Sequence, residues 1–343
     1  MAKRVLVGLS GGVDSTVVAK MLKDEGYEVV GVYMKLHDKP GYHETNLERV
    51  AKVADYLGID YHVLDLRELF RQRVYNPFVE EYRAGRTPNP CAVCNRHIKF
   101  GRMMAFADEI GADYLATGHY VRHDGRYIYE ATDKAKDQSY FLFDIDKSLL
   151  PRILFPLGGM RKEDVKTYAA KIEALKGFAE QKESSEICFV DTTYVDVLKE
   201  HMNIDMPGKV LDTQGNVIGH HKGYMHYTIG KRRGFHVKGA QEPHYVKEIR
   251  PETNEIVVTK RDTLLSRRIY FERSNLPAEV RRLETTVKIR YRTRPIPCEV
   301  TLDEKGGGEI VLHEEVYGVA PGQAAVFYEG EKLLGGGWIT GSD

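Results

Sequence analysis

Short apolar runs and segments with helical spacing alternate along the first 120 residues of the chain. Residues 4–10 (RVLVGLS) form a short apolar strand, and residues 28–34 (EVVGVYM) and 60–66 (DYHVLDL) are predicted to be further strands. Between them, residues 14–27 and 46–59 carry apolar side chains at the spacing of amphipathic helices. This alternation predicts an α/β domain with a doubly wound parallel sheet, whose ligand site lies at the carboxyl ends of the strands.

The pattern changes near residue 200, where short alternating strands are separated by turn-forming Gly, Pro and Asn. Helical candidates are few from there to the end of the chain. We therefore expect a catalytic domain over residues 1–195, a small central β-rich domain over 196–266, and a C-terminal β-barrel domain over 267–343.

Two parts of this β-rich region concentrate positive charge. Residues 213–241 contain no acidic side chain, and lysines and arginines there alternate with Tyr224, Tyr227 and Phe235, as phosphate contacts and base stacking require. Residues 287–294 (VKIRYRTR) are predicted to be a strand. At a period of two, one face of that strand would carry Lys288, Arg290, Arg292 and Arg294.

The overall composition bears on the kind of partner and on the cellular location. Lys+Arg and Asp+Glu are equal at 50 each, so a nucleic-acid partner would have to be held by such local patches rather than by net charge. No apolar run approaches the ~20 residues of a membrane helix. A glycine-rich turn stands where a signal peptide would have its apolar core, so we expect a cytoplasmic protein.

The stretch GLSGGVDS (residues 8–15) joins the first predicted strand to the first predicted helix. Glycines there allow backbone N–H groups to converge on an anion at the helix N-terminus. Ser10 and Ser15 can donate hydroxyl groups to phosphate oxygens, and Asp14 can hold Mg²⁺. No lysine follows the glycines, so the motif is not the lysine-containing loop of kinases and GTPases.

Four cysteines, Cys91, Cys94, Cys188 and Cys298, are too few for a disulfide framework in a chain of 343 residues. Cys91 and Cys94 form a CxxC in the loop TPNPCAVCN. This spacing is compatible with a redox pair, half a zinc site, part of an iron–sulfur site, or one nucleophilic cysteine beside a cysteine that takes no part in the reaction. Cys298 alternates with apolar residues and is expected to be a packing residue.

The strand, SGGVDS and helix together resemble the PP-loop ATP pyrophosphatases, which split ATP between the α and β phosphates. Met34 and Gly118 match two further parts of that pattern. The resemblance implies that ATP, with Mg²⁺, is bound by the following residues: Gly8, Leu9, Ser10, Gly11, Gly12, Val13, Asp14, Ser15, Met34 and Gly118.

Seven motifs in order resemble the bacterial tRNA-specific 2-thiouridylase family over nearly the whole chain. They are GLSGGVDS, TPNPCAVCNRHIKF, ATGHY (116–120), KDQSYFL (136–142), SSEICFV (184–190), YTIGKRRG (227–234) and PGQAAVFY (321–328). Seven ordered motifs are far more specific than any single one.

That resemblance implies an enzyme that adenylates O2 of the wobble uridine, position 34 of the tRNA, with release of pyrophosphate. It further implies that a persulfide on Cys188, loaded by a cysteine desulfurase or a sulfur-relay protein, attacks C2. Cys94 then forms a disulfide with Cys188, and the products are AMP and 2-thiouridine. A second thiol is needed because the outer sulfur must stay on the base while its bond to the enzyme breaks.

By the same resemblance, several residues contact tRNA around the anticodon loop. They are Asn89, Pro90, Cys91, His119, Lys136, Asp137, Gln138, Arg290, Tyr291 and Gln323. The target base must be splayed out before its C2 atom can be reached, which costs less in a single-stranded loop than in a duplex.

One departure from the family leaves an alternative open. Many members carry Asp where this chain has Cys91, and a thiol does not inherit the role of a carboxylate base. Cys91, Cys94 and Cys188 could instead ligate an iron–sulfur cluster. Zinc is disfavoured because neither a second CxxC nor a nearby His pair completes four ligands. Two rival functions also remain, a small-molecule adenylating ligase and a non-enzymatic RNA-binding or metal-binding protein.

Overall fold

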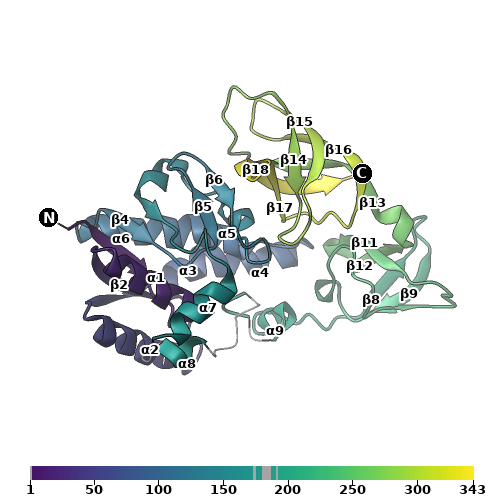
Figure 1. Cartoon of the computed structure of the whole chain (residues 1–343). Coiled ribbons are helices and arrows are strands. Elements are labelled where there is room, and N and C mark those ends of the chain that lie inside the picture. The colour runs from purple at the N-terminus through teal and green to yellow at the C-terminus, as the bar shows by residue number, and fades with distance from the viewer. Residues whose placement is uncertain (1, 173–174, 180–186, 191) are drawn as a thin grey trace. The chain divides into compact units, whose positions relative to one another are not determined.

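The computed structural model describes residues 2–172, 175–179, 187–190 and 192–343. These residues form two compact units. The first comprises Met1–Tyr75, Cys91–Phe189 and Glu331–Leu334, and the second comprises Asn76–Pro90, Val190–Gly330 and Gly335–Asp343. Figure 1 labels their helices and strands.

The N-terminal half of the chain alternates strands and helices as its apolar pattern predicts. Its strands are β1 (Arg4–Gly8), β2 (Glu28–Lys35), β3 (Tyr61–Asp65), β4 (Tyr114–Ala116), β5 (Val121–His123), β6 (Ile128–Glu130) and β7 (Ile153–Leu154). Its α-helices are α1 (Val13–Asp24), α2 (Tyr42–Leu57), α3 (Arg67–Phe70), α4 (Asn76–Arg83), α5 (Pro90–Cys94), α6 (Met103–Glu109), α7 (Lys162–Ala170) and α8 (Lys176–Ala179). Two π-helices, η1 (Arg71–Tyr75) and η2 (Asn95–Arg102), and two 3₁₀-helices, η3 (Ser139–Leu142) and η4 (Lys147–Arg152), complete this part.

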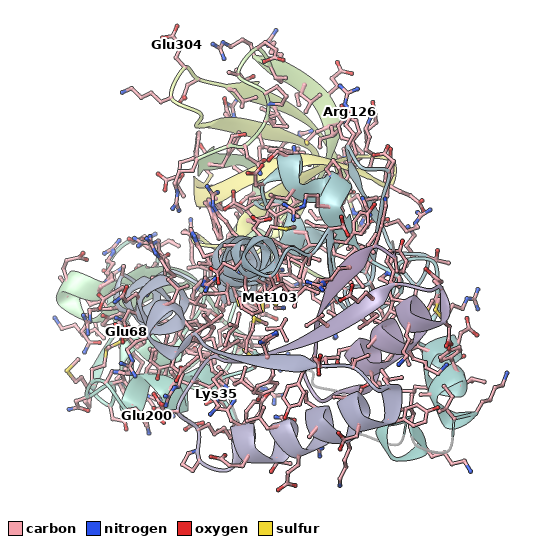
Figure 2. All side chains as sticks on the ribbon, turned by 90° about the vertical axis from the view of Figure 1, so that its left-hand side faces the viewer. Lys35, Glu68, Met103, Arg126, Glu200 and Glu304 are labelled. Atoms are coloured by element: carbon pink, nitrogen blue, oxygen red, sulfur yellow. The ribbon has the colours of Figure 1, made fainter. Side chains whose placement is uncertain are left out.

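Five of these strands form a parallel sheet in the order β3-β2-β1-β4-β7. Val5 and Val7 of β1 pack into a core with residues of α1, α2 and α7, while Leu6 between them is equally buried. Both faces of the sheet are therefore covered, and Figure 2 shows α2 and the helix that carries Met103 on opposite sides of the strands. The predicted doubly wound parallel sheet is confirmed.

Antiparallel pairing dominates the second half of the chain, which carries one further α-helix, α9 (Tyr194–Lys199). A first sheet has the order β10-β9-β8-β12-β11. Its strands are β8 (Gly208–Leu211), β9 (Val217–His221), β10 (His236–Val237), β11 (Tyr245–Arg250) and β12 (Glu255–Thr259), with η6 (Tyr224–His226), η7 (Pro251–Thr253) and η8 (Arg261–Leu264) in the connections.

The C-terminal strands close into a barrel, as predicted. They are β13 (Leu265–Glu272), β14 (Arg282–Lys288), β15 (Ile296–Leu302), β16 (Gly308–Tyr317), β17 (Ala324–Glu329) and β18 (Lys332–Ser342). Their order is β13-β16-β15-β14-β17-β18, and the additional β13–β18 pairing closes the ring. Cys298 faces this barrel's core with no exposed surface, as expected for a packing residue.

Two sequence-based predictions about local structure are wrong. The cysteine stretch is not a loop, because Cys91 and Cys94 lie in α5, and η2 follows directly. The basic segment 287–294 is not a continuous strand, because β14 ends at Lys288. The chain instead turns at residues 290–293, where the Thr293 N–H and hydroxyl both donate to the Arg290 carbonyl.

Candidate functional site

The glycine-rich loop lies at the carboxyl end of β1, directly before α1. Its shape is set by Ser15, whose hydroxyl accepts a hydrogen bond from the Ser10 N–H at 3.1 Å and donates one to the Gly12 carbonyl at 3.1 Å. Ser10 is exposed, whereas Leu9 and Val13 point into the core. The loop therefore turns its apolar side chains inward and leaves the Ser10 side chain outward, while Ser15 is buried within the turn.

Three glycines at this loop have no side chain where neighbouring protein segments come close. Gly11 adopts a left-handed φ of +79°, and an added Cβ would meet the Asn46 carbonyl oxygen at 3.1 Å. Gly118 follows β4, and an added Cβ would lie 3.1 Å from Asp14 Cβ and 3.3 Å from the Ser15 nitrogen. Gly12 precedes the 12-residue α1 as its N-cap. Glycines at this helix terminus fit the phosphates of a nucleotide.

Lys162 is a residue of this site that the sequence analysis missed. Its ammonium lies 2.6 Å from both carboxylate oxygens of Asp14, and the Tyr120 hydroxyl donates to Asp14 Oδ1 at 2.7 Å. Lys162 is only 8% exposed, and it also lies over the Tyr120 ring. Asp14, our expected Mg²⁺ ligand, is thus paired with a buried lysine in this structure. No local sequence motif identifies Lys162 as a site residue, because tertiary packing of α7 against α1 brings it to the loop.

The two cysteines of the CxxC lie on one helical turn. Cys91 is partly exposed, whereas Cys94, three residues later, is buried in a cluster with Leu66, Phe70, Val74 and Ile98. Met34, at the end of β2, is one of the partly buried residues that pack against the same cluster. The cysteine helix is thereby fixed to the carboxyl edge of the sheet.

Cys188 reaches the same place from a distant part of the sequence. The neighbouring Phe189 packs against the cluster that contains Cys94, and its ring lies 5.5 Å from that of Phe70 and 5.4 Å from that of Tyr75. Cys188 itself is exposed. Ser184–Glu186 of its motif lie outside the described residues.

The protein surroundings disfavour ionisation of all three thiols. Burial raises the pKa of Cys94 to about 12, and the neighbouring protein partly desolvates Cys188 and raises its pKa to about 11, although its side chain is exposed. Burial also raises the pKa of Cys91. Cys188 adds to the shift of Cys94, and Cys91 adds to the shifts of both, so the three sulfurs interact electrostatically. The positive charge of Lys99 opposes each of these shifts.

The thiols are not arranged as ligands of one metal centre. In the described part of the chain, no three His, Cys, Asp or Glu side chains are grouped so that they could hold a metal ion.

His119 and the KDQ segment lie near β4 in the first unit. His119 is buried, with Nδ1 2.7 Å from Thr117 Oγ1 and Nε2 3.4 Å from Lys99 Nζ. Asp137 is also buried and accepts hydrogen bonds from the Ala131 and Ser139 N–H groups. The Gln138 side chain accepts from the Tyr120 N–H at 2.9 Å, and Lys136 is partly exposed.

Asn89, Pro90 and Gln323 belong to the second unit. The Gln323 amide donates to the Thr87 carbonyl at 3.2 Å and the Pro88 carbonyl at 2.9 Å, immediately before Asn89. The preceding Gly322 has a φ of +90°, and an added Cβ would lie 2.7 Å from the Thr87 oxygen. This C-terminal turn therefore holds the segment that leads into α5.

The charged face predicted for residues 288–294 does not exist as a strand face. Lys288 is buried, with its ammonium 4.9 Å from the Tyr328 ring centre. Arg290 and Tyr291 lie in the turn after β14, where the Arg290 guanidinium donates to the Gly318 carbonyl. The even spacing of the charges misled the prediction, because the strand ends before Arg290.

The aromatic residues predicted for base stacking in residues 213–241 are largely unavailable. Tyr224 and Tyr227 are buried, and their hydroxyls donate to the carbonyls of Arg83 and Gly234. Phe235 is partly exposed, and Arg232 and Arg233 are exposed. The segment therefore has exposed positive charge, but two of these three aromatic side chains are buried in the core and are not available for base stacking.

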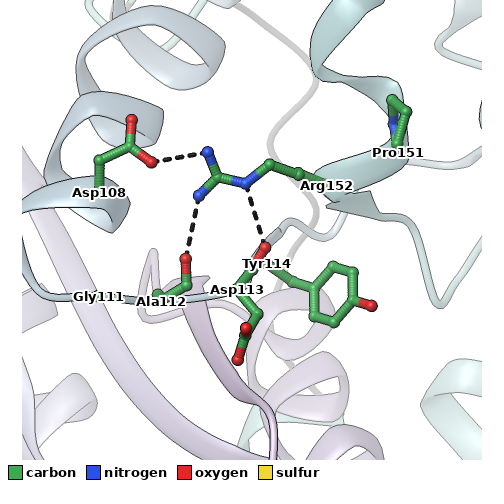
Figure 3. Close-up of a pocket in the computed structure, with 7 residues that line it drawn as sticks. All are labelled: Asp108, Gly111, Ala112, Asp113, Tyr114, Pro151 and Arg152. Carbon is green, nitrogen blue, oxygen red and sulfur yellow. Dashed lines mark hydrogen bonds and ion pairs between the residues drawn. The ribbon is translucent and has the colours of Figure 1, made fainter.

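A surface pocket of about 530 Å³ lies elsewhere, beside Arg152 (Figure 3). Arg152 pairs with Asp108 at 2.7 Å and donates to the Ala112 and Asp113 carbonyls. Asp113 N–H donates to the Arg4 carbonyl, so the pocket lies at the amino ends of β1 and β4. It is at the edge of the sheet opposite the glycine-rich loop and takes no part in the site described above.

Comparisons with known proteins cover almost the whole chain. Family models match in three consecutive stretches: a tRNA methyl transferase HUP domain over residues 3–192, a tRNA methyl transferase PRC-barrel domain over 195–260, and an aminomethyltransferase beta-barrel domain over 261–339. No described helix is both long and apolar enough to span a membrane.

Curated relatives are similar from end to end. The tRNA-specific 2-thiouridylase MnmA of Sulfurimonas denitrificans is 58% identical over 340 residues, which cover 99% of each chain. The protein of the same name from Nitratiruptor sp. is 57% identical and covers 99% of this chain and 100% of its own. A solved 4-thiouridine synthetase–RNA complex with bound ATP has a TM-score of 0.35 and 18% identity, covering 55% of this chain and 45% of that one, too slight a likeness to support an argument. On the sequence identities, this chain belongs to the tRNA-specific 2-thiouridylase MnmA family.

Proposed function

We propose that this protein is an ATP-dependent tRNA uridine 2-sulfurtransferase that converts wobble uridine 34 to 2-thiouridine. The observation that carries the proposal is that Phe189, next to Cys188, packs against the cluster that contains Cys94, in the unit that also bears the glycine-rich loop. Sulfur transfer to an activated carbon needs these parts together, namely an ATP site and two thiols within reach of each other.

In the first step, the uridine O2 atom attacks the α-phosphate of ATP, and the bond between the α and β phosphates breaks. Residues 8–15, Met34 and Gly118 would hold the nucleotide, with the exposed Ser10 and the N-terminus of α1 next to its phosphates, while Ser15 would keep the loop in shape through its bonds to Ser10 and Gly12. Asp14 would hold Mg²⁺, which would shield the negative charge of the phosphates, and its ion pair with Lys162 would have to open for the metal to bind. Pyrophosphate leaves, and O2 of the base becomes part of an AMP leaving group.

In the second step, sulfur replaces that oxygen. The terminal sulfur of a Cys188 persulfide attacks C2, and AMP departs with the oxygen and the electron pair of the broken C–O bond. The Cys94 thiolate then attacks the Cys188 sulfur. The bond between Cys188 and the transferred sulfur breaks, its electron pair stays on the sulfur now attached to C2, and a Cys94–Cys188 disulfide remains. A thiol reductant must restore both cysteines before the next cycle.

We assign tRNA recognition to residues of both units. Asn89, Pro90 and Cys91 would flank the extruded base, with His119 and Gln323 near the anticodon loop. Lys136, Asp137, Gln138, Arg290 and Tyr291 would contribute further contacts. The side chains of Asp137, Gln138 and Gln323 are bonded to backbone groups, so they would shape and fix the contact surface as well as touch RNA.

The sulfur donor would be another protein that carries a persulfide, either a cysteine desulfurase or a relay protein. Exposure of Cys188 supports direct transfer from such a partner, because a protein-bound persulfide cannot reach a buried thiol.

The test is incubation of the protein with ATP, Mg²⁺, unmodified tRNA and a persulfide donor, followed by mass spectrometry of the nucleosides. We expect 2-thiouridine at position 34 and AMP in equal amounts, with neither formed when ATP or tRNA is omitted. AMP formation without tRNA, or with a small metabolite in its place, would instead identify a small-molecule adenylating ligase.

A further inference from the structure

The raised pKa values of the thiols oppose the formation of the thiolates that the proposed reaction needs. Thiolates, not thiols, attack sulfur or carbon, yet the protein around Cys94 and Cys188 raises the pKa of both groups far above neutrality. A nearby positive charge is the usual means by which proteins stabilise a thiolate. The source of that charge is therefore a question about the mechanism.

Lys99 is placed by an unusual element of secondary structure. It lies in the π-helix η2, which continues the helix α5 that ends at Cys94. A π-helix joins each residue to the fifth one along, so Lys99 follows Cys94 by one such turn, and π-helical turns occur frequently at functional sites. The neighbouring Ile98 and Phe100 are fully buried and fix this turn in the core, while Lys99 stays partly exposed.

His119 holds the ammonium of Lys99 in position. Its Nε2 lies 3.4 Å from Lys99 Nζ, and its Nδ1 lies 2.7 Å from Thr117 Oγ1. Burial and the Lys99 charge lower the pKa of His119 well below its usual value, so the ring is neutral and can accept from Lys99 through Nε2. The Phe100 and Phe155 rings pack at 5.5 and 6.1 Å from the imidazole and restrict its rotation.

Other charges near the cysteines are directed elsewhere. Arg96, two residues after Cys94, pairs with Asp144 at 2.6 Å, and that carboxylate is nearly buried. The charge of Lys99, in contrast, acts on Cys91, Cys94 and Cys188 alike and lowers the pKa of each. Among the residues that the structure describes, Lys99 is thus a cation that acts on all three sulfurs.

We propose that Lys99, oriented by the buried neutral His119, is a positioning residue whose ammonium stabilises negative charge on the Cys94 and Cys188 sulfurs during sulfur transfer. This role rests on the proposed function, because it presumes that these two sulfurs react in turn. In this proposal His119 orients the Lys99 ammonium, in addition to any contact that it makes with tRNA.

Alkylation of the cysteines as a function of pH tests this role without ATP or tRNA. Iodoacetamide labelling, resolved by peptide mass spectrometry, reports the thiolate fraction at the exposed Cys188. We expect Lys99→Met to lower the rate of Cys188 labelling at pH 8 by about tenfold and to move the labelling profile to higher pH, since a neighbouring opposite charge shifts a pKa by about one unit or more. Lys99→Arg should keep a profile close to that of the unchanged protein.

Two controls make the result specific. Lys52→Met removes one positive charge from the exposed face of α2 and should leave the Cys188 profile unchanged. The buried Cys298 should stay unlabelled in every variant that is folded. If Lys99→Met fails this folding check, Lys99→Gln replaces it. The proposal is overturned if a folded Lys99→Met or Lys99→Gln variant labels at Cys188 with the profile of the unchanged protein.

The same variants separate this inference from the function on which it rests. If the unchanged protein makes 2-thiouridine while its Cys188 profile is insensitive to Lys99, only the role of Lys99 fails. If the unchanged protein makes no 2-thiouridine under the conditions given above, the proposed function fails, whatever the labelling shows.

Discussion

At the scale of single residues, the two reacting cysteines differ in a way that suits their proposed roles. Cys188 is exposed, as an acceptor of sulfur from another protein must be, whereas Cys94 is buried among apolar side chains. Burial protects a thiol from oxidants and from off-target exchange until a partner sulfur is next to it. This difference in exposure fits the proposed order, in which Cys188 is loaded first and Cys94 resolves second.

Changing Cys188 to Ser should abolish formation of 2-thiouridine, with a loss of at least about 1000-fold, because a hydroxyl cannot carry a persulfide. Binding of tRNA, measured by filter retention, should change by less than about twofold, since one exposed atom is altered. Cys298→Ala is the matched control and should retain activity. Measurable thiolation by Cys188→Ser would remove this residue from the mechanism.

Cys91 decides between a direct persulfide mechanism and the iron–sulfur alternative. We expect Cys91→Asp to keep activity within about tenfold, because neither thiol of the proposed transfer is removed. The measurement is the single-turnover rate of 2-thiouridine formation, together with the iron content of the purified protein. Complete loss of activity accompanied by loss of bound iron would favour the cluster instead.

At the scale of secondary-structure elements, the site depends on neighbours that only the tertiary fold creates. Parallel pairing of β1 with β4 brings Gly118 against the first turn of α1, and packing of α7 against α1 places Lys162 on Asp14. Both contacts join segments that are far apart in the sequence. The conformation of the nucleotide loop therefore depends on the order of the strands in the sheet as well as on the glycines of the loop.

Gly118→Ala should raise the KM for ATP by about tenfold or more, because its Cβ would crowd Asp14 and Ser15 and displace the loop. Steady-state kinetics at varied ATP concentration measures this change. Gly159→Ala is the control, since a Cβ at that position meets nothing within 4 Å. Equal KM values for the two variants would show that Gly118 is not near the nucleotide.

Much of the element order could be predicted from the sequence, because β1, β2, β3, α1 and α2 have strong apolar periodicity and clear helix ends. The helix at the cysteines could also have been found, since Asn89 and Pro90 are favoured residues for the cap and first turn of a helix. The role of Lys162 at the nucleotide loop could not be predicted, because no local sequence pattern marks this residue. The early end of β14 and the burial of Tyr224 and Tyr227 likewise depend on packing, which charge spacing does not report.

At the scale of the whole molecule, a protein with equal numbers of basic and acidic residues must bind tRNA through local features. The barrel offers exposed Arg292 and Arg294 beside Arg290, and the segment before it offers exposed Arg232 and Arg233. Arg290 is ordered by its hydrogen bond to Gly318, so its guanidinium is held in one place. Recognition by a few fixed cations should be moderately dependent on salt.

Arg290→Ala should weaken tRNA binding and reduce the slope of log affinity against log salt concentration by about one, as expected for loss of one phosphate contact. Filter binding at several salt concentrations provides the measurement. Lys305→Ala, in an exposed barrel turn, is the charge-matched control. An unchanged slope in Arg290→Ala would exclude this residue from the phosphate contacts.

The most direct test of the account follows both sulfurs through a single turnover. The protein is loaded with persulfide at Cys188, freed of donor and reductant, and mixed with ATP, Mg²⁺ and unmodified tRNA, and its peptides and the tRNA nucleosides are then quantified by mass spectrometry. We predict that the Cys94–Cys188 disulfide and 2-thiouridine appear together in equal amounts. Formation of 2-thiouridine while Cys94 stays a free thiol would contradict the account.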